Sequence, residues 1–333
     1  MADLNYTDFI HAIAASDHIA LAAPGMSDGD SVGTQCALLE LLLQLFPAKK
    51  MRIINEDPCP KRYHFLPLAK RFEVVSDVLA LPRSEWPQTM ICVDGGAERL
   101  GPDSLHLWKH ATNKGQVDHH AVGGGQNDYN FRLYDPKAAA TTEIIYRLAK
   151  AKNLKLTSSI AQAIYLGLIH DTGMFKHSNT SPEILRIAAD LLQCGFNHTE
   201  TAEKGLLVRS QSNLKMIKEV INNIHFDLNE RYVWGVLDCK SIAASGADAE
   251  EREGLIDLMF LTPRCEIAAL YTEVKPDQWR ISFRSRGWNV AALAHSLNVT
   301  GGGHVQAAGV NLEGKQAEVL NRCHEKINTL IHA

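Results

Sequence analysis

Short apolar runs alternate with amphipathic stretches from residue 18 onward. Three runs have the length and composition of buried strands, at residues 18–24, 51–56 and 89–94. Three stretches repeat apolar residues at helical spacing, at residues 34–46, 143–151 and 158–169. Alternation of this kind predicts an α/β fold whose N-terminal part is a doubly wound, mainly parallel sheet with helices on both faces.

The pattern changes towards the C-terminus. Residues 199–224 form a long, mostly polar run of helical character, which we interpret as a connector. Strand-like runs follow at residues 231–238, 265–274 and 278–286. A chain of 333 residues exceeds the usual size of a single core. We therefore expect a first domain over 1–195, a helical connector over 196–226 and a smaller α/β domain over 227–333.

Composition and charge exclude several classes of protein. The formal net charge is −4 and no basic tail is present, whereas proteins that track long nucleic acids concentrate positive charge on one face. The seven cysteines form no CxxC pair, so neither a thiolate zinc site nor a disulfide framework is indicated. No tract is apolar for long enough to span a bilayer, and the start resembles no signal peptide, so we expect a cytoplasmic protein.

Two carboxylates follow the first strand. Asp28 and Asp30 are two residues apart, and in an extended segment such residues point the same way and can meet at one ligand. The alternative is the start of a helix, with Asp30 or Ser31 as the N-cap and Asp28 favoured by the helix dipole. The local sequence leaves both interpretations open.

Further candidates follow other predicted elements. Asp94 ends an apolar run, and Asp118, His119 and His120 are adjacent and precede the glycines Gly123–Gly125. Asp171 ends a predicted helix directly after His170. Any one of these residues could be a turn or cap residue, but several together at the ends of successive elements indicate a site. Carboxylates with one or two imidazoles suit a pair of divalent ions that clamp a phosphoryl group.

A glycine-rich segment lies near the C-terminus. Gly301, Gly302 and Gly303 precede His304, and such glycines let a backbone approach an anion closely. The alternative is a flexible turn. Arg284 and Arg286 on the preceding predicted strand favour a phosphate-binding or base-binding role for this part of the chain.

Taken in order, the motifs DGD, D, DHH, DTG and GGGH resemble the DHH phosphoesterases with a DHH-associated C-terminal domain. Within that family the chain is most similar to the nano-RNase and pAp-phosphatase branch. The likeness covers nearly the whole chain. Secondary markers include residues 55–58 with 65–66, residues 135–143, and Phe175 with residues 178–180.

The resemblance implies roles for individual residues. It implies two divalent ions, usually Mn²⁺, with Mg²⁺ or Co²⁺ also compatible with the donor types. The metal ligands would be Asp28, Asp30, Asp94 as the bridging group, His119 and Asp171. His120 would position the phosphate or protonate the leaving oxygen, and Asp118 would orient the site. Arg284, Gly301, Gly302, Gly303 and His304 would hold the substrate.

One position departs from the family pattern. The first motif of the family normally begins with a histidine four residues before the DxD, and Pro24 stands there in this chain. His170, beside Asp171, is our candidate replacement for that imidazole. The alternative is that His170 contacts no metal and that one ion binds weakly.

The resemblance also implies an activity. We expect hydrolysis of short oligoribonucleotides or linear dinucleotides to mononucleotides, with conversion of pAp to AMP as a second activity, in the bacterial cytoplasm. No membrane partner is expected, and a homodimer is compatible with the family. The alternatives are an inorganic pyrophosphatase of the same superfamily, which would carry an SRKKQ-like motif that this sequence lacks, and a non-catalytic nucleotide-binding relative.

Overall fold

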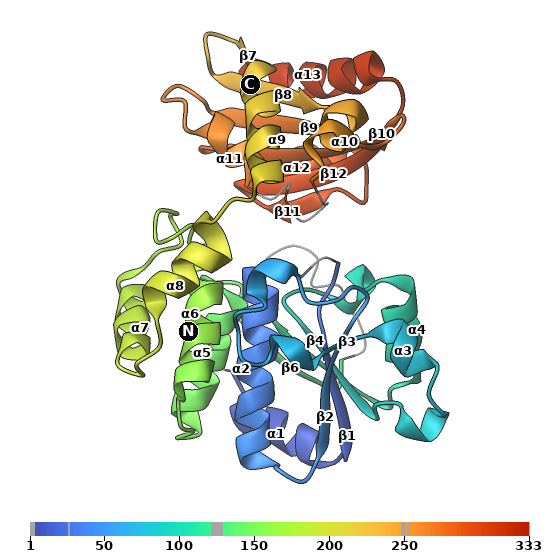
Figure 1. Cartoon of the computed structure of the whole chain (residues 1–333), viewed down its shortest axis with the longest axis vertical. Helices are drawn as coiled ribbons and strands as arrows, with labels where there is room; N and C mark the ends of the chain where they lie inside the picture. Colours follow the sequence, from blue (N-terminus) through green and yellow to red (C-terminus); the bar gives the residue numbers. More distant parts are fainter. Residues whose placement is uncertain (1–3, 26, 121–128, 248–250, 252–253, 333) are drawn as a thin grey trace. The chain divides into compact units, whose positions relative to one another are not determined.

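The computed structural model of the chain divides into two compact units, Met1–Val208 and Arg209–Ala333 (Figure 1). It describes residues 4–25, 27–120, 129–247, 251 and 254–332, so Gly123–Gly125 lie outside the described residues. Each unit contains one six-stranded sheet with helices packed on it, which confirms the predicted α/β fold class. Among the described helices, none is both long and apolar enough to cross a membrane.

The sheet of the first unit is parallel in all its described strand pairs. Its strands, in spatial order, are β3 (Phe72–Val74), β2 (Lys50–Asn55), β1 (His18–Ala22), β4 (Thr89–Val93), β5 (Asn113–Asp118) and β6 (Phe131–Tyr134). The strand order reverses between β1 and β4. In open α/β sheets, ligands bind beyond the carboxyl ends of the strands at such a reversal.

Helices cover both faces of this sheet (Figure 1). One face carries α1 (Tyr6–Ala14), α2 (Gly29–Leu45), α5 (Thr141–Ala151), α6 (Ser158–Asp171) and α7 (Pro182–Leu192), and the other carries α3 (Val75–Leu79) and α4 (Pro102–His110). Alternate residues of β1 enter the two resulting cores, Ile19 and Leu21 on the first face and Ala20 and Ala22 on the second. Burial on both faces explains why this strand is continuously apolar in sequence.

Helices α2 and α6 cross closely because Gly33 has no side chain. A Cβ atom at Gly33 would lie 2.4 Å from the carbonyl oxygen of Ala163. At the start of α2, a Cβ atom at Gly29 would lie 2.9 Å from ring atoms of His170. This crossing therefore brings the N-terminus of α2 against the C-terminus of α6, where several of the predicted site residues are found.

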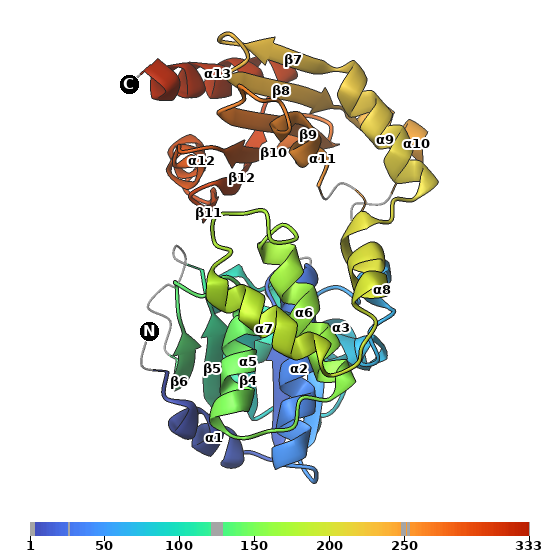
Figure 2. The ribbon, with the colours of Figure 1, turned by 90° about the vertical axis from the view of Figure 1, so that its left-hand side faces the viewer.

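The second unit has a mixed sheet with helices on both faces (Figure 2). Its strands, in spatial order, are β11 (Gly302–His304), β12 (Ala307–Glu313), β10 (Gln278–Ser285), β9 (Ile267–Lys275), β8 (Tyr232–Leu237) and β7 (Ile224–Asp227). Only the β8–β9 pair is parallel among the described pairs. One face packs on α12 (Val290–Leu297) and α13 (Gln316–His332), and the other on α9 (Gln211–Asn222), α10 (Cys239–Ser245) and α11 (Leu255–Phe260).

The run predicted as one long helix over 199–224 is interrupted. It contains α8 (His198–Ala202), a π-helical turn η5 (Glu203–Leu207) and α9. Ser210 caps α9, because its side chain accepts the backbone N–H of Asn213, and Val208 is extended. Short 3-10 turns complete the first unit: η1 (Lys61–Tyr63), η2 (Ala69–Arg71), η3 (Arg83–Glu85) and η4 (Ala97–Arg99).

Candidate metal centre

Asp28 is the N-cap of α2. Its Oδ1 atom accepts the backbone N–H groups of Asp30 and Ser31, each at 3.0 Å. The predicted cap at Asp30 or Ser31 was therefore wrong, and so was the extended pair of carboxylates, because Asp30 lies inside the first helical turn. Burial raises the pKa of Asp28 to about 6, although the nearby His170 opposes the rise.

Asp30 is fully buried and faces the N-terminus of α5. Its Oδ2 atom accepts the N–H of Thr141 at 2.6 Å, and its Oδ1 atom accepts the N–H of Thr142 at 3.0 Å and the hydroxyl of Thr142 at 2.7 Å. Burial raises the pKa of Asp30 well above its usual value, and the charges of Asp94 and Asp171 add to the rise. The N–H groups at the start of α5 are donors that favour a negative charge at this position.

Asp94 follows β4 directly, at the reversal of strand order. The hydroxyl of Ser31 donates to its Oδ2 atom at 2.5 Å, and the hydroxyl of Thr141 donates to its Oδ1 atom at 2.9 Å. Its backbone is left-handed, with φ of 58°, a conformation that aspartate tolerates better than most residues. Such strained positions cluster at functional sites, where surrounding contacts hold them in place.

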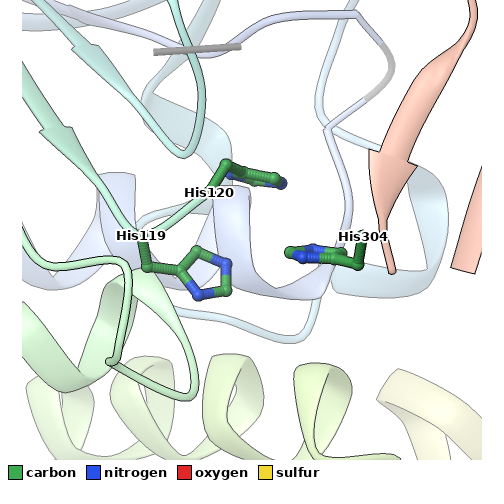
Figure 3. A group of neighbouring side chains, drawn as sticks. All are labelled: His119, His120 and His304. Carbon is green, nitrogen blue, oxygen red and sulfur yellow. The ribbon is translucent and has the colours of Figure 1, made fainter. Parts of the chain in front are cut away.

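His119 and His120 follow β5 and turn their rings in different directions (Figure 3). The ring centroids are 4.8 Å apart and the ring planes meet at 63°. The Nδ1 atom of His119 lies 3.0 Å from the carbonyl oxygen of Ala138, and its Nε2 atom lies 3.0 Å from Asp171 Oδ2. Burial disfavours the charged imidazole, but the hydrogen bond and charge of Asp171 outweigh it and raise the pKa of His119.

Asp118 and His120 form a hydrogen-bonded dyad. The Nδ1 atom of His120 lies 2.8 Å from Asp118 Oδ1, which also accepts the backbone N–H of His120 at 3.1 Å. Gln116 donates to the other carboxylate oxygen at 3.2 Å. Burial would raise the pKa of Asp118, but the contacts with His120 outweigh it and lower that pKa. The same hydrogen bond overcomes the effect of burial on His120 and raises its pKa.

Asp171 ends α6 and lies between two imidazoles. Its Oδ1 atom is 3.1 Å from Nδ1 of His170, and its Oδ2 atom is 3.0 Å from Nε2 of His119. Burial would raise the pKa of Asp171, but the two histidines outweigh it and lower that pKa far below its usual value. A carboxylate that stays charged between two nitrogen donors is well suited to bind a cation.

Within the described part of the first unit, the donor atoms form three sets, and in each set all atoms lie within 4.8 Å of one another. These sets are Asp30–His119–Asp171, Asp28–His170–Asp171 and Asp94–Asp118–His120. The structure thus brings all the site residues predicted in the first domain to one edge of the sheet. Carboxylate and imidazole donors together suit a divalent ion such as Mn²⁺, whereas structural zinc sites usually contain cysteine thiolates.

The site residues predicted in the second unit lie at one end of its sheet. Arg284 on β10 and His304 on β11 are both paired in register with Ala307, which lies on the strand between them. A Cβ atom at Gly301 would lie 2.4 Å from a carbonyl oxygen of α12, and one at Gly303 would lie 2.5 Å from the Ala307 carbonyl oxygen. Close packing within the unit therefore requires these two glycines.

Arg284 on β10 and Arg286, which follows the end of that strand, differ in their surroundings. Arg284 donates from Nε to Asp257 at 2.9 Å and from Nη1 to the carbonyl oxygen of Phe283. Arg286 donates to the backbone carbonyls of Phe260, Thr262, Pro263 and Cys265. The suggestion that Arg286 contributes to phosphate binding is therefore wrong, because its guanidinium holds the end of α11.

Several residues that hold the site were not identified from sequence. Ser31, Thr141 and Thr142 donate to the carboxylates, and Asn179 donates to the carbonyl oxygens of Ala139 and Asp171. In the sequence, residues 135–143 stand out only as a marker of the family resemblance. The fold explains the role of these residues, because the N-terminus of α5 points at the carboxyl ends of β1 and β4.

Comparisons with known proteins agree with this arrangement. The model of the DHH family, N-terminal domain, matches residues 19–168. A bifunctional oligoribonuclease and PAP phosphatase NrnA from Thermus thermophilus is 29% identical over 300 residues, which cover 90% of this chain and 85% of that protein. The NrnA of Bacillus subtilis is 27% identical over 92% of this chain and 93% of its own length.

A solved structure extends the likeness to the whole fold. The crystal structure of an exopolyphosphatase-related protein from Bacteroides fragilis aligns with a TM-score of 0.88 at 20% identity, over 99% of this chain and 98% of that one. The match to the DHH model and the NrnA relatives confirm the resemblance drawn from the ordered motifs. Residues 19–168 of this chain are thus similar to the N-terminal domain of the DHH family.

Proposed function

We propose that this chain is a metal-dependent phosphoesterase that hydrolyses short oligoribonucleotides or linear dinucleotides to mononucleotides and converts pAp to AMP. The observation that carries the proposal is the convergence of five carboxylates and three imidazoles at the start of α2 and the ends of β4, β5 and α6. They form three donor sets, and within each set the donor atoms lie within 4.8 Å of one another. The names of the NrnA relatives, which describe an oligoribonuclease and PAP phosphatase, support the choice of substrate.

Five residues would hold two divalent ions, with Mn²⁺ as the preferred ion: Asp28, Asp30, Asp94, His119 and Asp171. Bound ions would supply the positive charge that lowers the pKa of an attacking water and neutralises the phosphoryl oxygens. The protein contributes a rigid frame. Ser31 and Thr141 fix the orientation of Asp94, and Thr142 fixes that of Asp30.

His120 would act on the substrate itself. Its Nδ1 atom is engaged by Asp118, which fixes the orientation of the ring relative to the end of β5. An imidazole held in this way can donate a hydrogen bond to a phosphate oxygen or a proton to the leaving oxygen through its other nitrogen. Asp118 would be a positioning residue that acts through His120, because its Oδ1 atom is hydrogen-bonded to both the ring and the backbone N–H of that residue.

The second unit would bind the nucleotide. Arg284 and His304 are both paired with Ala307, and Gly301, Gly302 and Gly303 directly precede His304 in the chain. We assign catalysis to residues 1–195, substrate binding to residues 227–333 and a connecting role to residues 196–226. The net charge of −4 favours a short substrate in the bacterial cytoplasm over a long nucleic acid.

The test is a substrate panel with Mn²⁺, consisting of a two-nucleotide RNA, a five-nucleotide RNA, a long RNA, pAp and pyrophosphate. We expect mononucleotides from the two short RNAs, AMP from pAp and little cleavage of the long RNA. Asp94→Ala should be inactive, whereas Asp103→Ala, a matched exposed carboxylate on α4, should retain activity.

Other results would identify the alternatives. Phosphate released from pyrophosphate alone would assign the chain to the pyrophosphatases. Nucleotide binding without turnover of any substrate would identify a non-catalytic relative. Either result would contradict the proposed function.

A further inference from the structure

Two of the donor sets have the same composition. Each contains one carboxylate from the start of α2, one imidazole and Asp171: Asp30 with His119 in the first set, and Asp28 with His170 in the second. Asp171 belongs to both, with its two oxygens directed at the two imidazoles, at 3.0 Å and 3.1 Å. The arrangement is that of two adjacent ion positions that share one carboxylate.

The position of His170 depends on a glycine in the neighbouring helix. His170 lies in the last turn of α6, and a Cβ atom at Gly29 would lie 2.9 Å from its ring atoms. Any larger residue at position 29 would therefore displace the ring.

Pro24 contributes no nitrogen donor on the Asp28 side of the site. Its ring packs beside the residue that follows Asp94: a Cβ atom added at Gly95 would lie 2.8 Å from Pro24 Cγ. A proline ring has no donor atom for a cation. In the described first unit, the imidazole that shares a donor set with Asp28 comes from α6 instead.

We propose that His170 is a metal ligand, which holds a divalent ion together with Asp28 and Asp171 beside the ion held by Asp30, His119 and Asp171. The inference rests on the proposed function, because it concerns the same metal centre. It assigns the second ion position to a residue at the C-terminus of α6, where imidazole and carboxylate donors are adjacent in sequence.

A positioning role for His170 gives different expectations. If His170 only orients Asp171 through the hydrogen bond at its Nδ1 atom, an asparagine could replace it by placing an amide nitrogen near the same point. A metal ligand cannot be replaced in this way, because asparagine can place an atom at the position of Nδ1 but has none at the position of Nε2. Gly29→Ala offers an independent test, since it moves the ring without removing any donor.

The test is the number of Mn²⁺ ions bound by the purified chain, measured by isothermal titration and by elemental analysis after gel filtration. The wild type should bind two equivalents. His170→Ala and His170→Asn should bind one, and Gly29→Ala should bind its second ion at least about tenfold more weakly. His110→Ala is the matched control, because His110 ends α4 and belongs to none of the donor sets.

Two results would overturn the inference. One is two equivalents of unchanged affinity in His170→Ala or His170→Asn, and the other is a single equivalent in the wild type. Circular dichroism would establish that each variant is folded. Failure of the proposed function would look different, as a wild-type protein that binds two ions and hydrolyses none of the substrates.

Discussion

The hydroxyl of Thr141 donates a hydrogen bond to Asp94 at 2.9 Å, while its backbone N–H donates to Asp30 at 2.6 Å. One residue at the start of α5 therefore fixes two carboxylates that come from different segments, one inside α2 and one after β4. Hydrogen bonds to the carboxylates that would bind a metal ion fix the orientation of those carboxylates, and so affect the affinity for the ion.

Replacement of Thr141 by valine should weaken Mn²⁺ binding about 10- to 100-fold. Valine has nearly the same shape and keeps the backbone N–H to Asp30, but it leaves Asp94 with Ser31 as its remaining hydroxyl donor. Isothermal titration with Mn²⁺ measures the change. Thr141→Ser is the control and should bind Mn²⁺ like the wild type. Equal affinity in the valine and serine variants would contradict this role.

Replacement of Asp118 by asparagine should lower kcat roughly 100-fold with little change in KM. An amide has no negative charge to hold the His120 ring, and its orientation is ambiguous because one end donates and the other accepts. Steady-state kinetics on a dinucleotide substrate separates the two parameters. Asp103→Asn, an exposed residue of α4, is the control. A changed KM with unchanged kcat would place Asp118 in substrate binding instead.

The sequence predicted much of this molecule because its strongest signals are local. The apolar run 18–24 is a strand because both of its faces are buried, and Asp94, His119 and Asp171 are found at the ends of elements whose hydrophobic pattern is clear. The order of the motifs then allowed a family resemblance. These features depend on neighbouring residues in the chain, which a sequence displays directly.

Other features depend on contacts between distant segments. Thr142 meets Asp30 across 112 residues, and Thr141 meets Asp94 across 47. No local pattern indicates such a pair. The capping role of Asp28 was missed because both candidate interpretations began the helix too late. Arg284 and Arg286 look equivalent in sequence, but the position of α11 gives them different partners.

Replacement of Gly167 by alanine should destabilise the protein and weaken Mn²⁺ binding, although alanine is the better helix former. Helix propensity alone would stabilise α6 by about 1 kcal/mol. A Cβ atom at this position would lie 2.3 Å from both Asp30 Oδ1 and Thr142 Oγ1, so the hydrogen bond between them would have to break. Overpacking of this kind costs about 1–3 kcal/mol.

Thermal unfolding and Mn²⁺ titration test this prediction. The matched control is Ser158→Ala, an exposed position at the start of the same helix. A higher Tm for Gly167→Ala would mean that Asp30 is not held as the structure shows.

Arg284 and Arg286 provide a matched pair for the second unit. Arg284→Ala should raise KM for a dinucleotide about tenfold and leave the free energy of unfolding almost unchanged, because its exposed ion pair with Asp257 stabilises the fold little. Arg286→Ala should instead lower the free energy of unfolding by about 1–3 kcal/mol, because four backbone carbonyls lose their donor. Its KM should remain close to the wild-type value. Steady-state kinetics and urea denaturation of both variants make the comparison. If Arg284→Ala lost stability but kept its KM, a substrate-binding role for Arg284 would be contradicted.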